Sequence, residues 1–333
     1  METYSVELTQ ALETLIPVRI IALPGRADGA PPAMPALVAF MIRVFLQLLF
    51  AARPPGVVHL ADMVLWPLGL AALARSRRTR VVLSAHGTDV AFHKRGGVKG
   101  QAYGAYLRLG AKLMARATVI ANSSATHSMT AETGWKDIEV IALATRIDAP
   151  EPSGEHQAAL LFAGRLVERK GCAWFIRNVL PLLPPDIRLE VAGTRWDEDE
   201  SRVLDDPRVD FLGSLHGNAL IDAYRRALCV VVPNIRVASG EYEGFGLVAP
   251  EAAAAGGVVL AANCDGLVDA VIDGETCLLV ETGNPQAWRE AIEAVRLWSA
   301  AERQTFLRRA SERAKSYYNW ERVARATLDL YRI

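Results

Sequence analysis

The chain has 333 residues, of which 51% are hydrophobic and 22% are charged. This length favours two domains, each able to bury its own core, and the apolar content excludes an intrinsically disordered chain. The four cysteines are widely spaced and form no Cys-x-x-Cys pair, so the sequence indicates neither a cysteine zinc site nor a disulfide framework. We expect a cytoplasmic protein, because the chain opens without the basic, apolar and small-residue pattern of a signal peptide.

The formal net charge is zero, but the charge is unevenly distributed. Residues 1–150 contain 16 Lys or Arg and 10 Asp or Glu, a net charge of +6, so the remaining residues carry −6. A basic N-terminal half can approach an anionic membrane or an acidic acceptor, and an incidental solvated surface explains the charge equally well. The basic loop at 93–100, with Lys94, Arg95 and Lys99, would suit a lipid-linked acceptor at the inner face of the membrane. No basic face with interleaved aromatic residues argues for nucleic-acid binding.

Short apolar runs alternate with helical stretches along the chain, which predicts an α/β fold. In the first half we expect strands at 17–23, 56–61, 80–86, 117–122 and 138–143. Residues 144–157, with two prolines and a glycine, are typical of a linker. A second series of strands is expected at 158–164, 187–193, 209–213, 229–233, 257–263 and 275–280. Two doubly wound sheets in tandem would bind ligands at the carboxyl ends of their strands.

The segment from Ala33 to Ala52 is apolar except for Arg43 and Gln47, and it approaches the length needed to span a bilayer. Pro35 near its start and Arg43 near its middle weigh against insertion. We therefore expect a buried crossover helix between two strands. Any apolar surface left uncovered here would favour membrane contact or self-association.

Residues 241–260 read EYEGFGLVAPEAAAAGGVVL, with two glutamates, Glu243 and Glu251, eight positions apart. Gly244 and Gly246 permit a turn that brings backbone N–H groups close to a ligand, and the start of the following helix favours a phosphate. Glu251, on the first turn of that helix, could accept hydrogen bonds from sugar hydroxyls. The alternative is a strand, turn and helix whose glutamates are simply solvated.

Other nucleotide and metal motifs are absent from the sequence or weak. No Gly-x-Gly-x-x-Gly follows an expected strand and no phosphate-binding P-loop motif occurs, which argues against dinucleotide and P-loop chemistry. The acidic run from Asp197 to Asp199 resembles a pair of metal-binding carboxylates. It lies among further acids, however, and we expect a solvated loop or the start of a helix there.

The segment 241–260 resembles the glutamate-pair signature of the retaining GT-B glycosyltransferases of family 4, the group 1 type. Four further segments resemble that family and occur in its order: HGTD at 86–89, GRLVERKG at 164–171, DGLVDAVIDGETCLLV at 265–280 and WERVA at 320–324. The resemblance extends from about residue 57 to the end of the chain. It implies two Rossmann-like doubly wound domains that face each other across a cleft.

The resemblance assigns residues 1–149 to an acceptor-binding domain and 150–309 to a nucleotide-sugar-binding domain, with 310–333 a helix that crosses back to the first. Two features depart from the family pattern. Family members usually open with a strand and a double-glycine turn, followed by a helix. Here the segment that begins at Met1 resembles that helix, and we therefore expect the first strand and its glycines to be missing from this sequence. A late start site, a lost part of the donor site or a partner subunit would each account for this. TRID at 145–148 replaces the usual Asn-Gly-Val-Asp and could alter the hinge.

Family resemblance also implies the roles of individual residues. Arg165 and Lys170 would hold the donor diphosphate, where pre-placed cations stabilise the charge of the leaving phosphate. Glu251 would hold the ribose, and His86 would lie near the anomeric carbon. Glu243 and the amides from Phe245 on would contact the sugar and phosphate. The residues implied in donor binding are Gly164, Arg165, Lys170, Glu243, Gly244, Phe245, Gly246, Leu247, Val248 and Glu251. Those implied in catalysis are His86, Glu243, Arg165 and Lys170.

The expected function is transfer of a hexosyl unit from a nucleotide-diphospho-sugar, with retention of configuration and without a metal or another cofactor. The acceptor would be a glycan, a lipid-linked molecule or a small molecule, as in polysaccharide or glycolipid biosynthesis. Two alternatives stay open. One is an impaired homologue that binds nucleotide-sugar or serves as a partner subunit. The other is a nucleotide-sugar epimerase, which shares this architecture.

Overall fold

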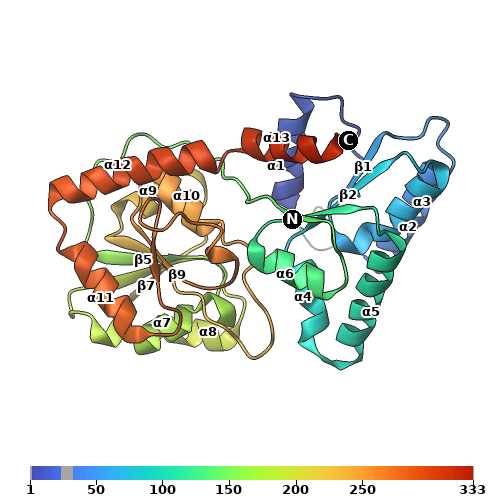
Figure 1. Cartoon of the computed structure of the whole chain (residues 1–333). Coiled ribbons are helices and arrows are strands. Elements are labelled where there is room, and N and C mark those ends of the chain that lie inside the picture. The colour runs from blue at the N-terminus through green and yellow to red at the C-terminus, as the bar shows by residue number, and fades with distance from the viewer. Residues whose placement is uncertain (1, 24–32, 333) are drawn as a thin grey trace. The chain divides into compact units, whose positions relative to one another are not determined.

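The structure is a computed structural model that describes residues 2–23 and 33–332 (Figure 1). The chain forms two compact units: unit 1 comprises Met1–Ile141 and Trp320–Ile333, and unit 2 comprises Ala142–Asn319. Helix α12, Ala300–Tyr317, runs without interruption through the boundary expected at residue 309. It packs on helix α10, Val248–Ala255, of unit 2, and the return to unit 1 comes at Trp320.

Unit 1 contains a parallel sheet of four strands in the order β1-β2-β3-β4. The strands are β1 Val57–Leu60, β2 Arg80–Ala85, β3 Thr118–Ala121 and β4 Ile138–Val140. These four strands confirm the prediction, because each lies within an expected apolar run. The helices between them are η1 Met63–Leu65, α3 Trp66–Arg75, α4 Thr88–Ala91, η2 Phe92–Arg95, α5 Gly97–Leu113 and α6 Ser124–Glu132.

The first and last helices, α1 Glu2–Glu13 and α13 Trp320–Tyr331, pack against each other in unit 1. A chain of hydrogen bonds joins them to the sheet. The Tyr331 hydroxyl lies 2.6 Å from His59 Nδ1, His59 Nε2 lies 2.8 Å from Ser84 Oγ, and Ser84 Oγ lies 3.1 Å from the Tyr4 hydroxyl. Burial, with a smaller contribution from the nearby His86, lowers the pKa of His59 to about 4. His59, which has no role assigned from sequence, is therefore a neutral structural link.

The strand expected at 17–23 does not form, which corrects the prediction. Ile21 packs on the core of unit 1, but Ile20 is 59% exposed. A strand needs a neighbour for its backbone hydrogen bonds, and no described residue forms a ladder with this segment. Local composition favours a strand here, but the pairing that would stabilise it is absent from the described residues.

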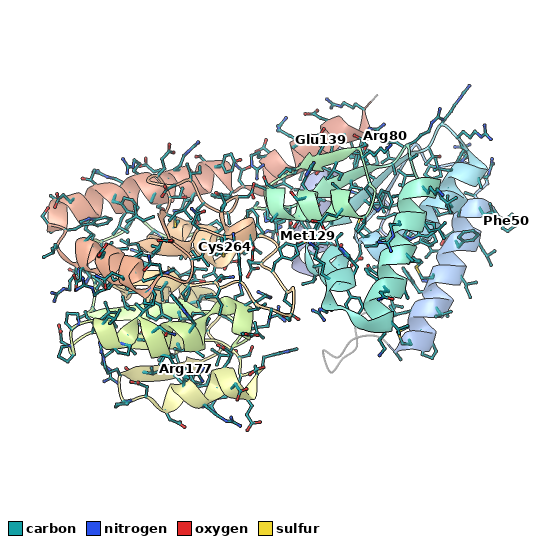
Figure 2. All side chains as sticks on the ribbon, turned by 60° about the horizontal axis from the view of Figure 1, so that its bottom comes forward. Phe50, Arg80, Met129, Glu139, Arg177 and Cys264 are labelled. Carbon is teal, nitrogen blue, oxygen red and sulfur yellow. The ribbon has the colours of Figure 1, made fainter. Side chains whose placement is uncertain are left out.

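Helix α2, Met34–Leu49, packs against α3 and buries Val44 and Leu48. Its other side is open, which corrects the expectation of a buried crossover helix. The exposed fractions of its apolar side chains are 70% for Met34, 52% for Val38, 56% for Ile42 and 47% for Leu46, and Phe50 just after it is 76% exposed. Figure 2 shows the labelled Phe50 pointing away from the rest of this unit. Among the helices of residues 2–23 and 33–332, none combines the length and apolarity needed to cross a bilayer.

Unit 2 contains a parallel sheet of six strands in the order β10-β9-β8-β5-β6-β7. The strands are β5 Ala159–Ala163, β6 Arg188–Ala192, β7 Val209–Gly213, β8 Cys229–Val232, β9 Val259–Ala262 and β10 Leu278–Val280. All six lie in the runs predicted from the sequence. The strand order reverses between β5 and β8, and the loops after these two strands therefore flank a crevice of the kind that binds ligands in doubly wound sheets.

Helices cover both faces of this sheet, with α9, α10 and α12 on one side and α7 and α8 on the other (Figure 1). Residues of β8 and β9 are buried throughout, as expected for central strands covered on two faces. The α-helices are α7 Cys172–Asn178, α8 Glu198–Arg202, α9 Gly217–Arg226, α10 Val248–Ala255, α11 Pro285–Arg296 and α12. The short 3-10 helices are η3 Glu168–Lys170, η4 Leu180–Leu182, η5 Val203–Asp205 and η6 Asp265–Leu267.

Candidate donor-binding site

Two loops of unit 2 meet at the reversal of strand order, one after β5 and one after β8. The loop after β5 begins at Gly164, whose N–H donates to Ala192 O over 2.9 Å. A Cβ on Gly193 would lie 1.8 Å from Gly164 O, so only glycine at 193 permits this close approach. In the loop after β8, Ile235 N donates to Arg169 O over 3.1 Å and joins the two loops.

Glu243 is held by three side chains from these loops. Its Oε2 accepts hydrogen bonds from Arg169 Nη1 at 2.9 Å, from Asn234 Nδ2 at 3.1 Å and from Lys170 Nζ. Burial opposes ionisation of this carboxyl, but the two cations and the hydrogen bonds outweigh it and lower the pKa of Glu243 to about 2. Glu243 is therefore a carboxylate at neutral pH.

Arg169 and Asn234 are functional candidates that the sequence does not reveal. Arg169 is 7% exposed, and its Nε also lies 3.9 Å from Glu241 Oε2. Its guanidinium therefore contacts both Glu241 and Glu243 from the buried side of the glutamate segment. The segment GRLVERKG shows two adjacent cations, Arg169 and Lys170. Only the fold shows that the first is buried and the second lies beside both glutamates.

The turn after Glu243 is supported by residues 265 and 266. Gly266 N donates to Glu243 O over 2.9 Å, and Glu243 N donates to Asp265 Oδ2 over 3.3 Å. A Cβ on Gly266 would lie 2.2 Å from Gly244 O, so the two segments touch through their backbones. Gly246 adopts a φ of +89°, which a residue with a Cβ rarely adopts.

Helix α10 begins directly after this turn. Within the described residues, the N–H groups of Leu247 and Val248 have no hydrogen-bond partner. Such unpaired N–H groups, together with the positive end of the helix dipole, favour an anion. The N–H groups of Leu247 and Val248 can therefore donate hydrogen bonds to an anion.

Glu251 lies on the first turn of α10, where burial raises its pKa to about 7 and the nearby Lys170 partly opposes that rise. In the part of the chain that the structure describes, its carboxyl makes no hydrogen bond. A buried carboxyl with unused acceptor positions is suited to bind hydroxyl groups. The structure thus brings Lys170, Glu243 and Glu251 together.

Arg165 lies on the same loop as Lys170 but is exposed. Its guanidinium stacks 5.5 Å from the centre of the Trp196 ring, and no carboxylate of the described residues pairs with it. An exposed, unpaired guanidinium on an aromatic ring is already oriented for an anion. Lys170, in contrast, is paired with Glu243.

His86 belongs to unit 1 and follows β2. Its Nε2 lies 2.8 Å from Ala61 O, and because a carbonyl only accepts, Nε2 carries the hydrogen. Burial lowers the pKa of His86, which keeps the ring neutral and leaves Nδ1 as an acceptor. The Asp89 carboxylate accepts the His86 backbone N–H at 2.8 Å and fixes the HGTD turn.

The acidic run at 197–199 forms the start of helix α8. The sequence predicted either a solvated loop or the start of a helix at this position. Asp197 caps α8, since its Oδ1 accepts from Asp199 N at 2.8 Å and Glu200 N at 3.2 Å. Arg202 pairs with Glu198 and Asp199. Within residues 2–23 and 33–332, no cluster of three or more His, Cys, Asp or Glu is placed to hold a metal ion.

Solved structures with similar folds include glycosyltransferases. HepE of Anabaena in complex with UDP is 19% identical with a TM-score of 0.70, over 90% of this chain and 83% of HepE. Sucrose-phosphate synthase of Thermosynechococcus elongatus is 22% identical with a TM-score of 0.67, over 92% of this chain and 81% of the synthase. At these identities the likeness shows the fold alone. The chain has the GT-B fold, which confirms the predicted fold class.

Sequence comparison identifies the family. The family profile for glycosyl transferases group 1 matches residues 157–296, and the profile for glycosyltransferase family 4 matches residues 1–147. The chain belongs to this family of glycosyltransferases.

Two curated relatives resemble about half of the chain. Glycogen synthase of Mycobacterium tuberculosis is 34% identical over 187 residues, which cover 52% of this chain and 42% of the synthase. D-inositol 3-phosphate glycosyltransferase of Nocardioides sp. is 34% identical over 200 residues, covering 54% of this chain and 42% of that protein. The chain thus spans less than half the length of these relatives.

Proposed function

We propose that the chain transfers a hexosyl unit from a nucleotide-diphospho-sugar to an acceptor hydroxyl, with retention of configuration. The observation that carries this proposal is the arrangement in unit 2: Lys170 pairs with the partly buried Glu243 and lies near the partly buried Glu251, and Arg165, which has no ion-pair partner among the described residues, lies on the same loop. The UDP bound to HepE, a protein of the same fold, supports a nucleotide-linked donor. We place the reaction in the cytoplasm.

In the proposed reaction, the bond between the anomeric carbon and the diphosphate oxygen breaks, and the acceptor oxygen bonds to that carbon on the same face of the sugar. The acceptor proton passes to the leaving phosphate, so the products are a glycoside and a nucleoside diphosphate. Arg165, Lys170 and the N–H groups of Leu247 and Val248 stabilise the charge that develops on the leaving phosphate. We also propose a catalytic role for His86, whose Nδ1 is available as a hydrogen-bond acceptor.

These groups neutralise the leaving diphosphate without a metal ion, so we propose a metal-independent transfer. The test is a panel of UDP-, GDP- and ADP-sugars, each with a glucan or an inositol phosphate, the acceptors that the relatives' names suggest. We expect release of nucleoside diphosphate that depends on the acceptor and persists in excess EDTA. Loss of activity in EDTA and its return with Mn²⁺ would contradict metal independence. Conversion of the donor sugar without an acceptor would indicate an epimerase.

The pKa of Glu251 predicts how nucleotide binding depends on pH. Ribose hydroxyls donate to a carboxylate, and the Glu251 carboxyl is protonated below its pKa of about 7. Binding below that pH must release the proton, so affinity should fall as pH decreases, approaching about tenfold per pH unit, and should level off above about pH 7. Titration calorimetry with a nucleoside diphosphate from about pH 5.5 to about pH 8.5 measures this dependence.

Glu251→Gln is the matched control, because the amide keeps the size and one acceptor oxygen but does not titrate. The nucleotide's own phosphate titrates equally in both experiments, so the difference between the two proteins isolates Glu251. We expect the variant to bind more weakly than the wild type above pH 7 and to lack the additional loss at low pH. Identical pH profiles for the two proteins would remove Glu251 from the ribose site.

A further inference from the structure

The open side of α2 is a continuous apolar stripe. Met34, Val38, Ile42, Leu46 and, just after the helix, Phe50 follow one another at intervals of four residues, so each lies beside the next in a row that winds gradually around the open side of α2. All five are exposed, while the opposite side of α2 packs on α3. Soluble proteins rarely expose an apolar stripe of this kind to water, and such surfaces usually mark a site that binds another protein or a membrane.

Arginines gather at the C-terminal end of this stripe. Arg75, at the end of α3, donates from Nε to Ala51 O at 2.8 Å and from Nη2 to Ala52 O at 3.3 Å. The hydroxyl of Thr79 donates to Pro55 O at 2.8 Å and fixes the turn before it. These bonds join the segment after α2 to the turn after α3. The arginines collected there are Arg53, Arg75, Arg77 and Arg78.

No acid opposes this charge nearby in the chain. From residue 33 to residue 131 the only acidic residues are Asp62 and Asp89. Both are partly buried, and burial raises the pKa of each to about 6. Within the described residues, none of the four arginines forms an ion pair. An apolar stripe that ends in unpaired cations is complementary to a bilayer with anionic headgroups.

We propose that the α2 stripe and the four arginines, here called the α2 face, bind the surface of an anionic phospholipid bilayer. The helix would lie in the plane of the interface, with its apolar side chains at the headgroup boundary and its arginines on lipid phosphates. This proposal does not depend on the proposed transfer reaction, because it concerns a different surface and is measured without donor.

The α2 face fits a membrane better than the basic segment at 93–100, which the sequence predicted as a loop but which forms the end of η2 and the start of α5. In that segment, Lys94 Nζ lies 2.8 Å from Glu132 Oε2, and the guanidinium of Arg95 lies 5.3 Å from the centre of the Phe92 ring. One of its three cations is therefore neutralised by a carboxylate. The segment also lacks an apolar stripe, since Val98 is its one exposed large apolar residue.

The test is co-sedimentation of the full chain with vesicles of phosphatidylcholine alone and of phosphatidylcholine mixed with phosphatidylglycerol. We expect binding to the anionic vesicles that weakens as salt rises, and weaker binding to neutral vesicles. Arg53→Ser/Arg77→Ser/Arg78→Ser should reduce the partition coefficient by about 100-fold, at about fivefold per arginine, and flatten its salt dependence. Leu46→Ser/Phe50→Ser should reduce it by on the order of tenfold.

Leu182→Ser/Leu297→Ser is the matched control, because these leucines of unit 2 are 44% and 79% exposed and lie outside the α2 face. This control should bind as the wild type does, and circular dichroism should be unchanged in all variants. Two results would overturn the proposal: wild-type protein that stays in the supernatant with anionic vesicles at low salt, or α2-face variants that bind like the wild type. A third contradictory result would come from sedimentation velocity. If the wild type is a dimer, and Leu46→Ser/Phe50→Ser abolishes the dimer but leaves lipid binding unchanged, the stripe binds a second copy of the chain.

Discussion

Arg165→Ala/Lys170→Ala is expected to abolish measurable nucleoside diphosphate binding. Each lost charge-assisted contact should cost about 1.5–3 kcal/mol of binding free energy. Arg165→Ala is the cleaner single change, because the described residues give the Arg165 side chain no partner besides the Trp196 ring. Lys170→Ala also removes a partner of Glu243, but Arg169 and Asn234 still hold that carboxylate. Calorimetric titration with UDP, GDP and ADP measures the loss.

Arg309→Ala is a suitable control for the double variant. Its guanidinium also stacks on an aromatic ring, 5.7 Å from the centre of the Phe306 ring, but it lies on α12 away from both loops of the site. This variant should bind nucleoside diphosphate as the wild type does. Unchanged affinity in Arg165→Ala/Lys170→Ala would show that the diphosphate binds elsewhere.

Gly171→Ala is expected to destabilise unit 2 by about 2–5 kcal/mol. Gly171 adopts a φ of +70°, and an added Cβ would lie 2.0 Å from the backbone oxygen of Pro233. The left-handed backbone costs a non-glycine residue about 1–2 kcal/mol, and the overpacking adds about 1–3 kcal/mol. Because Gly171 follows Lys170, the strain should also displace the lysine. Urea unfolding measures the free energy of unfolding.

Gly274→Ala separates the two costs. Gly274 has nearly the same φ, +71°, but a Cβ there would meet nothing within 4 Å. We expect this variant to lose only about 1–2 kcal/mol, the cost of the left-handed backbone. Equal losses at the two positions would show that the contact with Pro233 relaxes without cost.

The strands of both sheets were predictable because they are short apolar runs bounded by turn residues. Segment 17–23 has the same local character but forms no strand, since a strand depends on a partner that local sequence does not specify. The exposure of α2 was missed for a related reason. An apolar helix is expected to be buried, and only the fold shows that α3 covers one of its sides.

In the candidate site, the sequence predicted the residues of the glutamate segment and the two cations Arg165 and Lys170. It did not predict Arg169 or Asn234, because their importance comes from burial against Glu243 rather than from spacing. It also did not predict that Lys170 would be paired with Glu243. That contact joins the loop after β5 to the loop after β8, which are far apart in sequence. The two loops meet only because β5 and β8 are neighbours in the sheet, where the strand order reverses.

The most direct test of the proposed function is an NMR spectrum of the glycoside that the wild-type chain forms from a nucleotide-sugar. For an α-linked donor, our account predicts an α-linked product and one nucleoside diphosphate per glycoside, with excess EDTA present throughout. The Arg165→Ala/Lys170→Ala variant, folded as judged by circular dichroism, should form neither. A β-linked product would contradict retention, and equal product formation by the double variant would contradict the assignment of the donor site.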